Sequence, residues 1–345
     1  MNKLYSNEIV FPGHPDKICD QISGAILDWC LKYDPHTRAG IETLGGKGLI
    51  VVTGEVTTNA KLSSLIVEGI VKRILCNYNY DADHYRILFN IGTQSHDIAQ
   101  GVDIGGAGDQ GMMFGYACNE TDKFLPKAMV ILQEFSKRYE DIRKKYPKLF
   151  YADGKAQITG VYDDEFRLKK IKTFLISYQN SETRRDLTDN ILKLEALDIC
   201  KKYGIYDVDE FLFNPTGKFL IGGFQGDAGL TGRKIVVDAY QSFANVGGGC
   251  MNGKDSTKVD FSAAHKAREL AVRYLKEHNL KWCEVQLSYA IGKEEPLAIY
   301  IDSNIGNLTP KDTDYRECTP KRIIDDLGLL NINYEELAKF GHFTR

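Results

Sequence analysis

The sequence lacks the cysteine patterns of metal-binding and disulfide-rich proteins. Its eight cysteines are scattered, and none forms a C-x-x-C pair or has a histidine at zinc-ligand spacing. A reduced, cytoplasmic chain is the simplest interpretation, because disulfides persist mainly in oxidising compartments. The pattern therefore gives no support for a zinc site or a disulfide framework.

Long apolar runs and an excess of one charge are also missing. No apolar stretch approaches the roughly 20 residues that span a bilayer, and residues 1–11 lack the apolar core of a signal peptide. The 44 Lys and Arg residues against 47 Asp and Glu residues leave a net charge of −3, without a basic tail or stripe. We therefore expect a soluble chain with no membrane or nucleic-acid partner, whose basic residues bind a small anionic ligand.

Several catalytic motifs are absent as well. The sequence contains no G-x-S-x-G elbow, no H-E-x-x-H helix and no kinase H-R-D with D-F-G, so hydrolase triads, zinc proteases and protein kinases lack their parts. At 345 residues and 43% hydrophobic content, the chain is nevertheless long enough for several domains with a buried core. A reaction at a phosphorylated ligand that needs no activated side-chain nucleophile would fit.

Glycine-rich turns that carry charged residues are what the sequence has instead. In residues 247–260, glycines surround two lysines and two acids. Glycines let backbone N–H groups approach phosphate oxygens, lysines neutralise them, and carboxylates can hold Mg²⁺. The segment nearly matches a P-loop, but Asp255 stands where that motif needs Ser or Thr. We interpret it as a phosphate loop of another kind, with an ordinary surface turn as the alternative.

Three further turns share this chemistry, which is more than solubility requires in a nearly neutral chain. Residues 13–17 place His14, Asp16 and Lys17 at an expected helix N-terminus, where free N–H groups attract anions. A solvated first turn is the alternative there. The other two turns pair acids with bases, Asp227 with Arg233 and Lys234, and Asp153 with Lys155.

Residues 106–111 match G-x-G-x-x-G, the pattern of dinucleotide-binding folds. We reject that interpretation, because the nearest expected strand ends near Gly92 and a polar, glycine-rich stretch follows it. Residues 94–105 fit a mobile lid that closes over a reactive ligand, with an ordinary surface loop as an equal alternative.

Apolar periodicity predicts alternating hairpins and helices, beginning with a helix from Pro15 that has Ile18, Ile22 and Ile26 on one face. Hairpin-then-helix units recur about three times, so we expect an α+β protein of three similar layers. The predicted domains are 1–100, 101–222 with the lid and the GAGDQG loop, and 223–345 with the GGGCMNGKD loop. The predicted strands are 39–44, 49–56, 85–91, 156–162, 170–178, 219–223, 234–240, 282–290 and 297–301, and the later helices are 62–75, 123–139, 183–202, 262–277 and 320–327.

Taken in order, these motifs resemble the methionine adenosyltransferase (S-adenosylmethionine synthetase) family along nearly the whole chain. The matching segments are 13–17, 106–116 (GAGDQGMMFGY), 214–217 (NPTG), 226–234 and 247–260. The resemblance implies synthesis of S-adenosylmethionine from ATP and L-methionine, with the triphosphate cleaved to phosphate and pyrophosphate. It also implies three similar domains, each a mixed sheet with helices on one face, related by approximate internal threefold symmetry. Homodimers or homotetramers with active sites shared between subunits are expected.

The resemblance assigns each site residue a role. The expected polyphosphate ligands are His14, near the leaving oxygen, and Lys155, Arg233, Lys234 and Lys254. The expected metal ligands are Asp16 and Asp260 for Mg²⁺, two ions per site, and Glu42 for K⁺. The expected methionine ligands are Glu55, Gln94, Asp227 and Lys258. The expected nucleotide contacts are Phe219, which stacks on adenine, with Lys218, Asp109 and Asp153.

The sequence departs from the family pattern in several places. The loop Gly-Gly-Gly-Ala-Phe-Ser-Gly-Lys-Asp has Cys-Met-Asn at its centre here, and Phe261 replaces an arginine. The lid before Gly106 is several residues short, and the chain stops soon after residues 341–343. Every assigned charge remains, so we expect catalysis to survive. A non-catalytic regulatory subunit and an unrelated ATP phosphotransferase are the alternatives.

Overall fold

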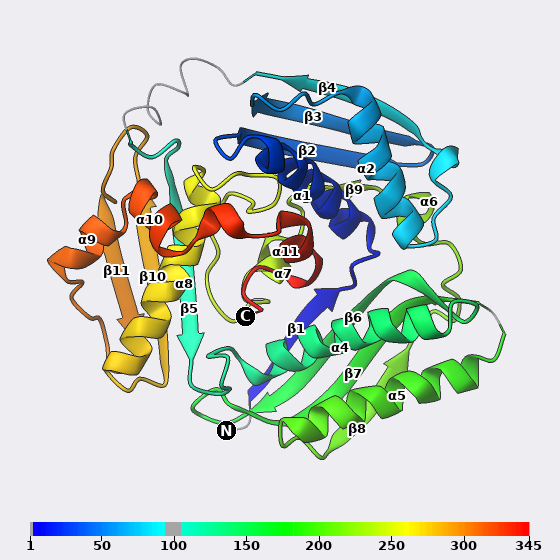
Figure 1. Cartoon of the computed structure of the whole chain (residues 1–345). Helices are drawn as coiled ribbons and strands as arrows, with labels where there is room; N and C mark the ends of the chain where they lie inside the picture. The colour runs from blue at the N-terminus through cyan, green and yellow to red at the C-terminus, as the bar shows by residue number, and fades with distance from the viewer. Residues whose placement is uncertain (1–2, 94–104, 182, 345) are drawn as a thin grey trace.

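The computed structural model describes residues 3–93, 105–181 and 183–344. Three sheets lie around a central helical region, and helices cover one face of each sheet (Figure 1). The α+β class expected from the sequence is confirmed. The internal threefold symmetry and the domain boundaries near residues 100 and 222 stay predictions.

The first sheet is built mainly from the N-terminal part of the chain, in the order β4-β3-β2-β9. Strands β2 (Arg38–Gly46) and β3 (Leu49–Thr57) form an antiparallel hairpin, and β4 (Arg86–Gly92) runs parallel to β3. The short strand β9 (Gly229–Leu230) pairs with the far end of β2. The helices of this layer are α1 (Pro15–Tyr33), which packs on β2, α2 (Ser64–Asn77) and the 3₁₀ turn η1 (Ala82–His84).

Helix α1 follows the sequence rules for a helix start. His14 is the N-cap and Pro15 occupies the first turn, where the missing N–H costs nothing. Ile18, Ile22 and Ile26 are fully buried, so the predicted apolar face is confirmed. The N-terminus of the helix lies against β9, because a Cβ at Gly229 would be 2.3 Å from the Pro15 carbonyl oxygen.

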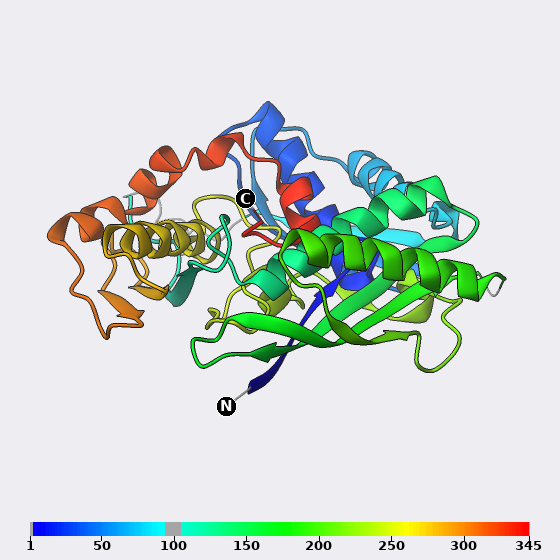
Figure 2. The same ribbon diagram turned by 90° about the horizontal axis from the view of Figure 1, so that it is seen from below.

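The second sheet has the order β1-β6-β7-β8. Strand β1 (Lys3–Val10) pairs antiparallel with β6 (Phe150–Tyr162), so that Val10 lies opposite Lys155. Strand β7 (Leu168–Asn180) follows, and β8 (Val208–Phe213) runs parallel to it. Figure 2 shows helices α4 (Lys127–Lys145) and α5 (Arg185–Lys202) side by side on one face of this sheet.

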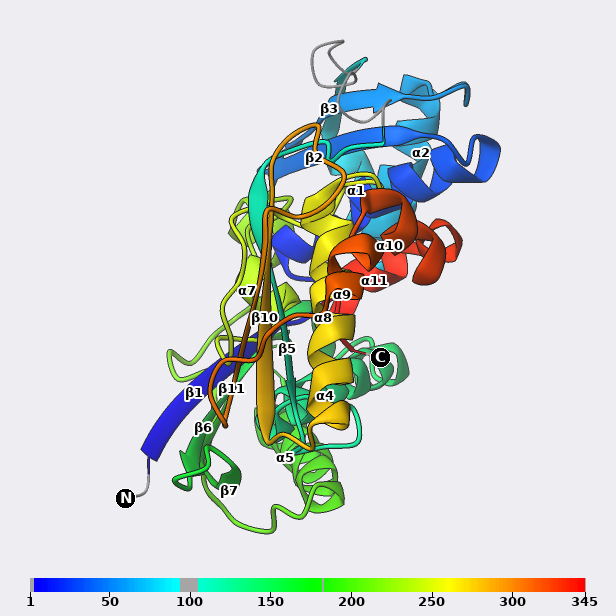
Figure 3. The same cartoon turned by 90° about the vertical axis from the view of Figure 1, so that its left-hand side faces the viewer.

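The third sheet joins β5 (Gly111–Cys118) to β10 (Trp282–Tyr289) and β11 (Ala298–Ser303). Helix α8 (Val259–Glu277) covers one face of it, as the edge-on view in Figure 3 shows. Gly115 allows this close approach, because a Cβ there would lie 1.9 Å from the carbonyl carbon of Ala267. The chain then returns to α1 through α9 (Asp312–Glu317), α10 (Pro320–Asp326), η2 (Leu329–Asn331) and α11 (Tyr334–Phe340).

Each sheet takes a strand from outside the segment that supplies most of it. β9 joins the N-terminal sheet, β1 joins the sheet of β6 and β7, and β5 joins the sheet of β10 and β11. This exchange brings turns that are far apart in the sequence to one place. The glycine-rich turn 226–234 thereby meets the start of α1.

Two predicted strands, 219–223 and 234–240, are wrong. The first segment is irregular and leads into α6 (Gly223–Gly226). The Phe219 carbonyl accepts the Asn180 N–H, and the chain then turns inward. The second contains the short helix α7 (Ile235–Asp238), which is closed by the Asp238 N–H on the Lys234 carbonyl, 2.8 Å away. Short apolar runs such as Ile-Val-Val fit a strand and a buried helical turn equally well.

Candidate active site

His14 stands at the N-terminus of α1 as a buried, neutral imidazole. Its Nδ1 accepts the backbone N–H of Asp16 at 3.2 Å. Burial and then the positive charge of Lys234 lower the pKa of His14 to about 3. Since Nδ1 is an acceptor, the neutral ring carries its proton on Nε2. That nitrogen is a hydrogen-bond donor available to a ligand without any change of protonation.

Asp16 is buried beside His14 and is surrounded by donors. Its carboxylate accepts the Leu230 N–H at 2.9 Å and pairs with Lys234, while the Arg233 Nε lies 3.6 Å away. Burial would raise the pKa of Asp16, but the hydrogen bonds from Lys234 and Leu230 outweigh it and hold the pKa below its ordinary value. The residue is therefore an anion at neutral pH, placed between α1 and the turn before α7.

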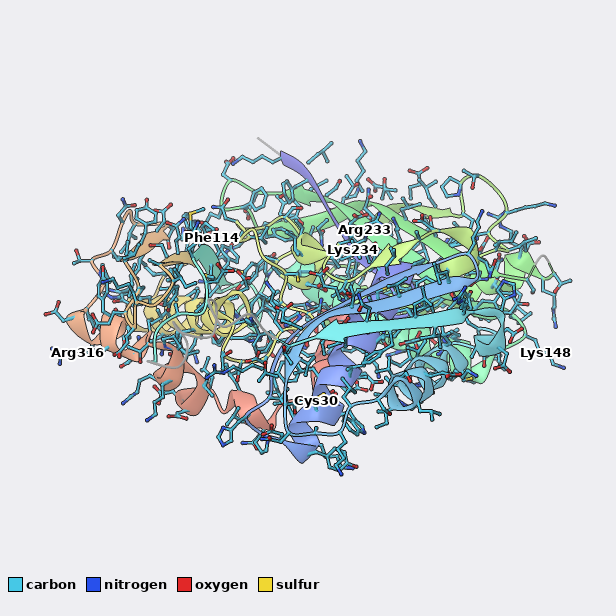
Figure 4. The ribbon with its side chains drawn as sticks, turned by 90° about the horizontal axis from the view of Figure 1, so that it is seen from above. Cys30, Phe114, Lys148, Arg233, Lys234 and Arg316 are labelled. Atoms are coloured by element: carbon cyan, nitrogen blue, oxygen red, sulfur yellow. The ribbon has the colours of Figure 1, made fainter. Side chains whose placement is uncertain are left out.

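A pocket of about 270 Å³ brings three of the predicted polyphosphate ligands together, and we name it the basic pocket. Lys155 of β6 lines it with Arg233 and Lys234, which Figure 4 shows next to each other near the middle of the molecule. Glu8 of β1 is the acidic residue in its wall. The charges of Lys234 and Lys155 also act on His14, so the four cationic or donor groups form one site.

The loop 247–255 is fixed against the edge of β2. The Ile41 N–H donates to the Gly253 carbonyl at 2.9 Å, and Asp255 accepts the Ala39 N–H at 2.7 Å. Gly253 has a φ of +74°, and a Cβ there would lie 2.0 Å from the Ile41 oxygen, so only glycine fits. Asp255 is therefore a structural anchor, and it holds Lys254 in a fixed position.

A second cleft, of about 410 Å³, lies between this loop and the outer face of β2 and β3, and we name it the mixed cleft. Lys254 pairs with Asp260 there, and the Lys258 Nζ lies 4.0 Å from the Glu55 Oε1. Burial would lower the pKa of Lys254, but the hydrogen bond and charge of Asp260 raise it above the ordinary value. The predicted site residues that line the mixed cleft are Glu42, Glu55, Asp109, Lys254, Lys258 and Asp260.

The basic pocket and the mixed cleft are neighbours but separate. Gly232 of the turn 226–234 touches the loop between them, because a Cβ at this position would lie 2.5 Å from the Cys250 Cβ. The structure thus gathers His14, Lys155, Arg233 and Lys234 on one side and places Lys254 on the other. The five predicted polyphosphate ligands do not share a single pocket within one chain.

Six of the predicted site residues that the structure describes line neither cavity: His14 and Asp16, which lie beside the basic pocket, and four others. Asp153 is buried, accepts the Gly223 N–H at 2.9 Å, and has a pKa raised to about 6 by burial. Lys218 is exposed, Phe219 is half-buried, and Asp227 is exposed with its carboxylate on the Ala228 N–H. Their predicted roles therefore stay predictions. Gln94 and nearly all of the predicted lid lie outside the described residues.

Lys17 differs from the sequence interpretation, which grouped it with the phosphate ligands. It is 1% exposed and contacts Asp20 at 3.0 Å and Asp238 at 2.6 Å. Asp238 also accepts the Asn252 amide at 2.7 Å, and Asn252 bonds to His342. Lys17 is therefore part of a buried network that ties α1 to the phosphate loop. No motif in the sequence indicated this network, because its members come from four distant segments.

A larger cavity, of about 820 Å³, lies near α8, η2 and α11, and no predicted site residue lines it. Nine of the predicted site residues line the basic pocket or the mixed cleft instead. Among residues 3–93, 105–181 and 183–344, no helix has the length and apolar character to cross a bilayer.

Comparison with known proteins gives an independent test of the resemblance. Models of the S-adenosylmethionine synthetase N-terminal, central and C-terminal domains match residues 2–96, 104–219 and 221–345. The S-adenosylmethionine synthase of Clostridium tetani (strain Massachusetts / E88) is 40% identical over 375 residues, covering 100% of this chain and 95% of that protein. The S-adenosylmethionine synthase of Staphylococcus epidermidis (strain ATCC 12228 / FDA PCI 1200) is 39% identical, covering 99% and 93%. On these matches and the domain order, the chain belongs to the S-adenosylmethionine synthetase family, the methionine adenosyltransferases.

Proposed function

We propose that this chain makes S-adenosylmethionine by direct attack of the methionine sulfur on C5′ of ATP, and then cleaves the triphosphate to phosphate and pyrophosphate. The observation that carries the proposal is the convergence of Lys155, Arg233 and Lys234 on one pocket beside neutral His14. A thioether sulfur has a lone pair and no proton, so its attack needs no general base. The barrier lies in the departure of a highly charged triphosphate, which fixed cations stabilise.

His14 is suited to the leaving oxygen of this reaction. Its Nε2–H points away from the nitrogen that accepts the Asp16 N–H, so it can donate to a ligand oxygen while the ring stays neutral. The free N–H groups of the first turn of α1 add to the same positive potential. His14 therefore supplies a donor that strengthens as negative charge develops on the oxygen.

Asp16 and Asp260 fit the proposed magnesium ligands. Each side chain is paired with a lysine, Asp16 with Lys234 and Asp260 with Lys254. Bound phosphate oxygens would pair with Lys234 and Lys254. Asp16 and Asp260 would then be available as metal ligands. Mg²⁺ is commonly bound by one or two carboxylates together with phosphates and waters, so it does not need a larger cluster of protein ligands. Among the described residues there is no cluster of three or more His, Cys, Asp or Glu side chains. When bound, Mg²⁺ neutralises charge on the triphosphate.

The mixed cleft suits the zwitterion of L-methionine. Lys258 offers an ammonium for the substrate carboxylate, and Glu55 a carboxylate for the substrate amine, with 4.0 Å between them. We assign Glu42 of β2, which lines the same cleft, to K⁺. Phe219 and Lys218 are assigned to adenine, Asp109 and Asp153 to the nucleotide, and Asp227 and Gln94 to methionine.

A second copy of the chain would complete the site. The mixed cleft opens on the outer face of the first sheet, where Leu44 is 46% exposed. The third sheet exposes Met112 and Tyr300 in the same way. Apolar side chains on uncovered sheet faces favour association. We propose a homodimer in which the basic pocket of one subunit faces the mixed cleft of the other, and a homotetramer would be two such dimers.

One assay tests the reaction against its rivals. Purified protein is incubated with ATP, L-methionine, Mg²⁺ and K⁺, and products are identified by mass spectrometry and phosphate counting. We expect a sulfonium product with equal amounts of phosphate and pyrophosphate. A phosphorylated acceptor would instead identify a phosphotransferase. Absence of any product, with activity only after addition of a catalytic homologue, would identify a regulatory subunit.

Mixed dimers test the shared site. Lys155→Ala and Lys254→Ala subunits are each expected to be nearly inactive as homodimers. If the two lysines of one site come from different subunits, a heterodimer of these variants has one intact site. Random assembly of equal amounts then restores about a quarter of wild-type activity. Coexpressed variants that stay as inactive as the separate ones would show that both lysines of a site belong to one chain.

A further inference from the structure

The chain adopts an unfavourable backbone conformation directly beside the basic pocket. Gln241 and Ser242 have φ values of +51° and +75°, a region that non-glycine residues rarely occupy even singly. Strand β1 holds both residues in place. The Tyr5 hydroxyl donates to the Ser242 carbonyl, and the Asn7 Nδ2 donates to the Gln241 Oε1 at 2.7 Å. The contacts therefore stabilise a conformation that the local sequence disfavours.

The Gln241 side chain carries a buried donor that is not used. The residue is 1% exposed, and within the described residues its Nε2 has no hydrogen-bond partner. The Oε1 accepts from the Asn7 Nδ2, and the Asn7 Oδ1 is likewise buried without a partner among the described residues. Buried polar groups are nearly always paired, so an unpaired buried donor calls for an explanation. A ligand that is absent from the structure is one.

The position of Gln241 indicates which ligand. Gln241 and Ser242 line the basic pocket together with Lys155, Arg233 and Lys234. Three cations in the same wall favour an anion, and a neutral amide adds a donor without adding charge. Unlike Lys234, which pairs with Asp16, the amide has no carboxylate competing for it before the ligand enters.

We propose that Gln241 is a further binding residue of this site, whose Nε2–H donates to a phosphate oxygen of the polyphosphate held by Lys155, Arg233 and Lys234. This inference rests on the proposed function and specifies how the triphosphate is held. The strained backbone at 241–242 is part of the pocket wall, from which the unpaired amide would reach the phosphate. Its contribution is one hydrogen bond to a charged acceptor.

Inorganic tripolyphosphate with Mg²⁺ is the probe, and its affinity is measured by calorimetry without methionine. Gln241→Met keeps the size of the side chain and removes the donor, so we expect binding weaker by roughly tenfold to a hundredfold. Gln241→Glu adds a negative charge beside phosphate and is expected to bind more weakly still. The KM for ATP should rise in the same order, with the KM for methionine unchanged.

Two variants separate binding from folding. Gln241→Gly also removes the amide but accepts a positive φ, so its melting temperature should hold while its tripolyphosphate affinity falls. Gln133→Met is the matched control, since Gln133 is an equally buried glutamine on α4 whose amide has no partner among the described residues. It should leave the affinity unchanged.

The outcomes distinguish this inference from the proposed function. If Gln241→Met and Gln241→Gly bind tripolyphosphate as the wild type does while the wild type makes S-adenosylmethionine, Gln241 is only structural and the inference is overturned. If the wild type makes no sulfonium product, the proposed function fails, and a loss of tripolyphosphate affinity in both variants would still support Gln241 as a phosphate ligand.

Discussion

The basic pocket and the mixed cleft differ in the balance of their charges. The basic pocket is lined by three cationic side chains and one acid. The mixed cleft is lined by two lysines and four acids, so acids are in excess there. The first is preorganised for an anion. The second would repel a polyphosphate unless cations enter with it, which is the condition that magnesium and the methionine amine would meet.

The contrast extends to the paired groups. Beside the basic pocket, Asp16 is buried, and its two cationic neighbours line the pocket, with Arg233 half exposed. In the mixed cleft, Lys254 and Asp260 are both partly exposed and face the same space. Losing a cation should therefore affect both folding and turnover in the basic pocket, but mainly turnover in the mixed cleft.

Lys234→Ala is expected to give the largest effect. It removes a proposed phosphate ligand, so kcat should fall by roughly a thousandfold, as expected for the loss of a donor that stabilises the charge of the transition state. It also removes the ion-pair partner of buried Asp16, so the melting temperature should fall. Steady-state kinetics and thermal unfolding measure both. Lys234→Arg is the control, which should keep the fold. Normal turnover in Lys234→Ala would show that the basic pocket does not hold the triphosphate.

Lys254→Ala should reduce kcat by about a hundredfold with little change in the melting curve. Its ammonium contacts Asp260 at a partly exposed site and supports no core packing, and its loop is anchored independently by Gly253 and Asp255. The exposed Lys321→Ala serves as a control for loss of a lysine. Unchanged turnover with a normal melting curve would mean that Lys254 has been assigned the wrong role.

Local signals in the sequence predicted much of this architecture. The helix from Pro15 and the hairpin of β2 and β3 were found because their periodicity and turn residues act within a few positions. Four strands were missed, and three of them, β1, β5 and β9, complete sheets supplied largely by other parts of the chain, while β8 pairs with β7 across helix α5. Their environment is set by distant partners, which no local pattern records.

The same limit applies to the site. Charged residues among glycines were recognised as ligands because their chemistry is local. Glu8 and Gln241 were missed. Glu8 joins the basic pocket only because β1 pairs with β6, and Gln241 joins it only through the turn after α7. Lys17 was misread for the opposite reason, because its two buried carboxylate partners are not apparent from the motif.

Glu55→Gln should distinguish the cavities by substrate. If the mixed cleft holds methionine, removing this carboxylate weakens the contact with the substrate amine, and the KM for methionine should rise by about tenfold. The KM for ATP should change little, because Glu55 does not line the basic pocket. Initial rates at varied concentrations of each substrate give both constants. A selective rise in the KM for ATP would reverse the assignment of the two cavities.

The acid dependence of stability tests the neutral state of His14. Its pKa is lowered to about 3 by burial and then by Lys234, so between pH 6.5 and 3 the unfolded chain binds a proton that the folded chain does not. The free energy of unfolding therefore falls as the pH is lowered through this window.

Compared with His14→Asn, which cannot titrate, the wild type should lose about 2 kcal/mol of unfolding free energy between pH 7.5 and pH 5. Asp153, whose pKa is raised to about 6, has the opposite sign but is present in both proteins and cancels. Urea unfolding at both pH values measures the difference, and a constant gap would mean that folded His14 is protonated at the same pH as the unfolded residue.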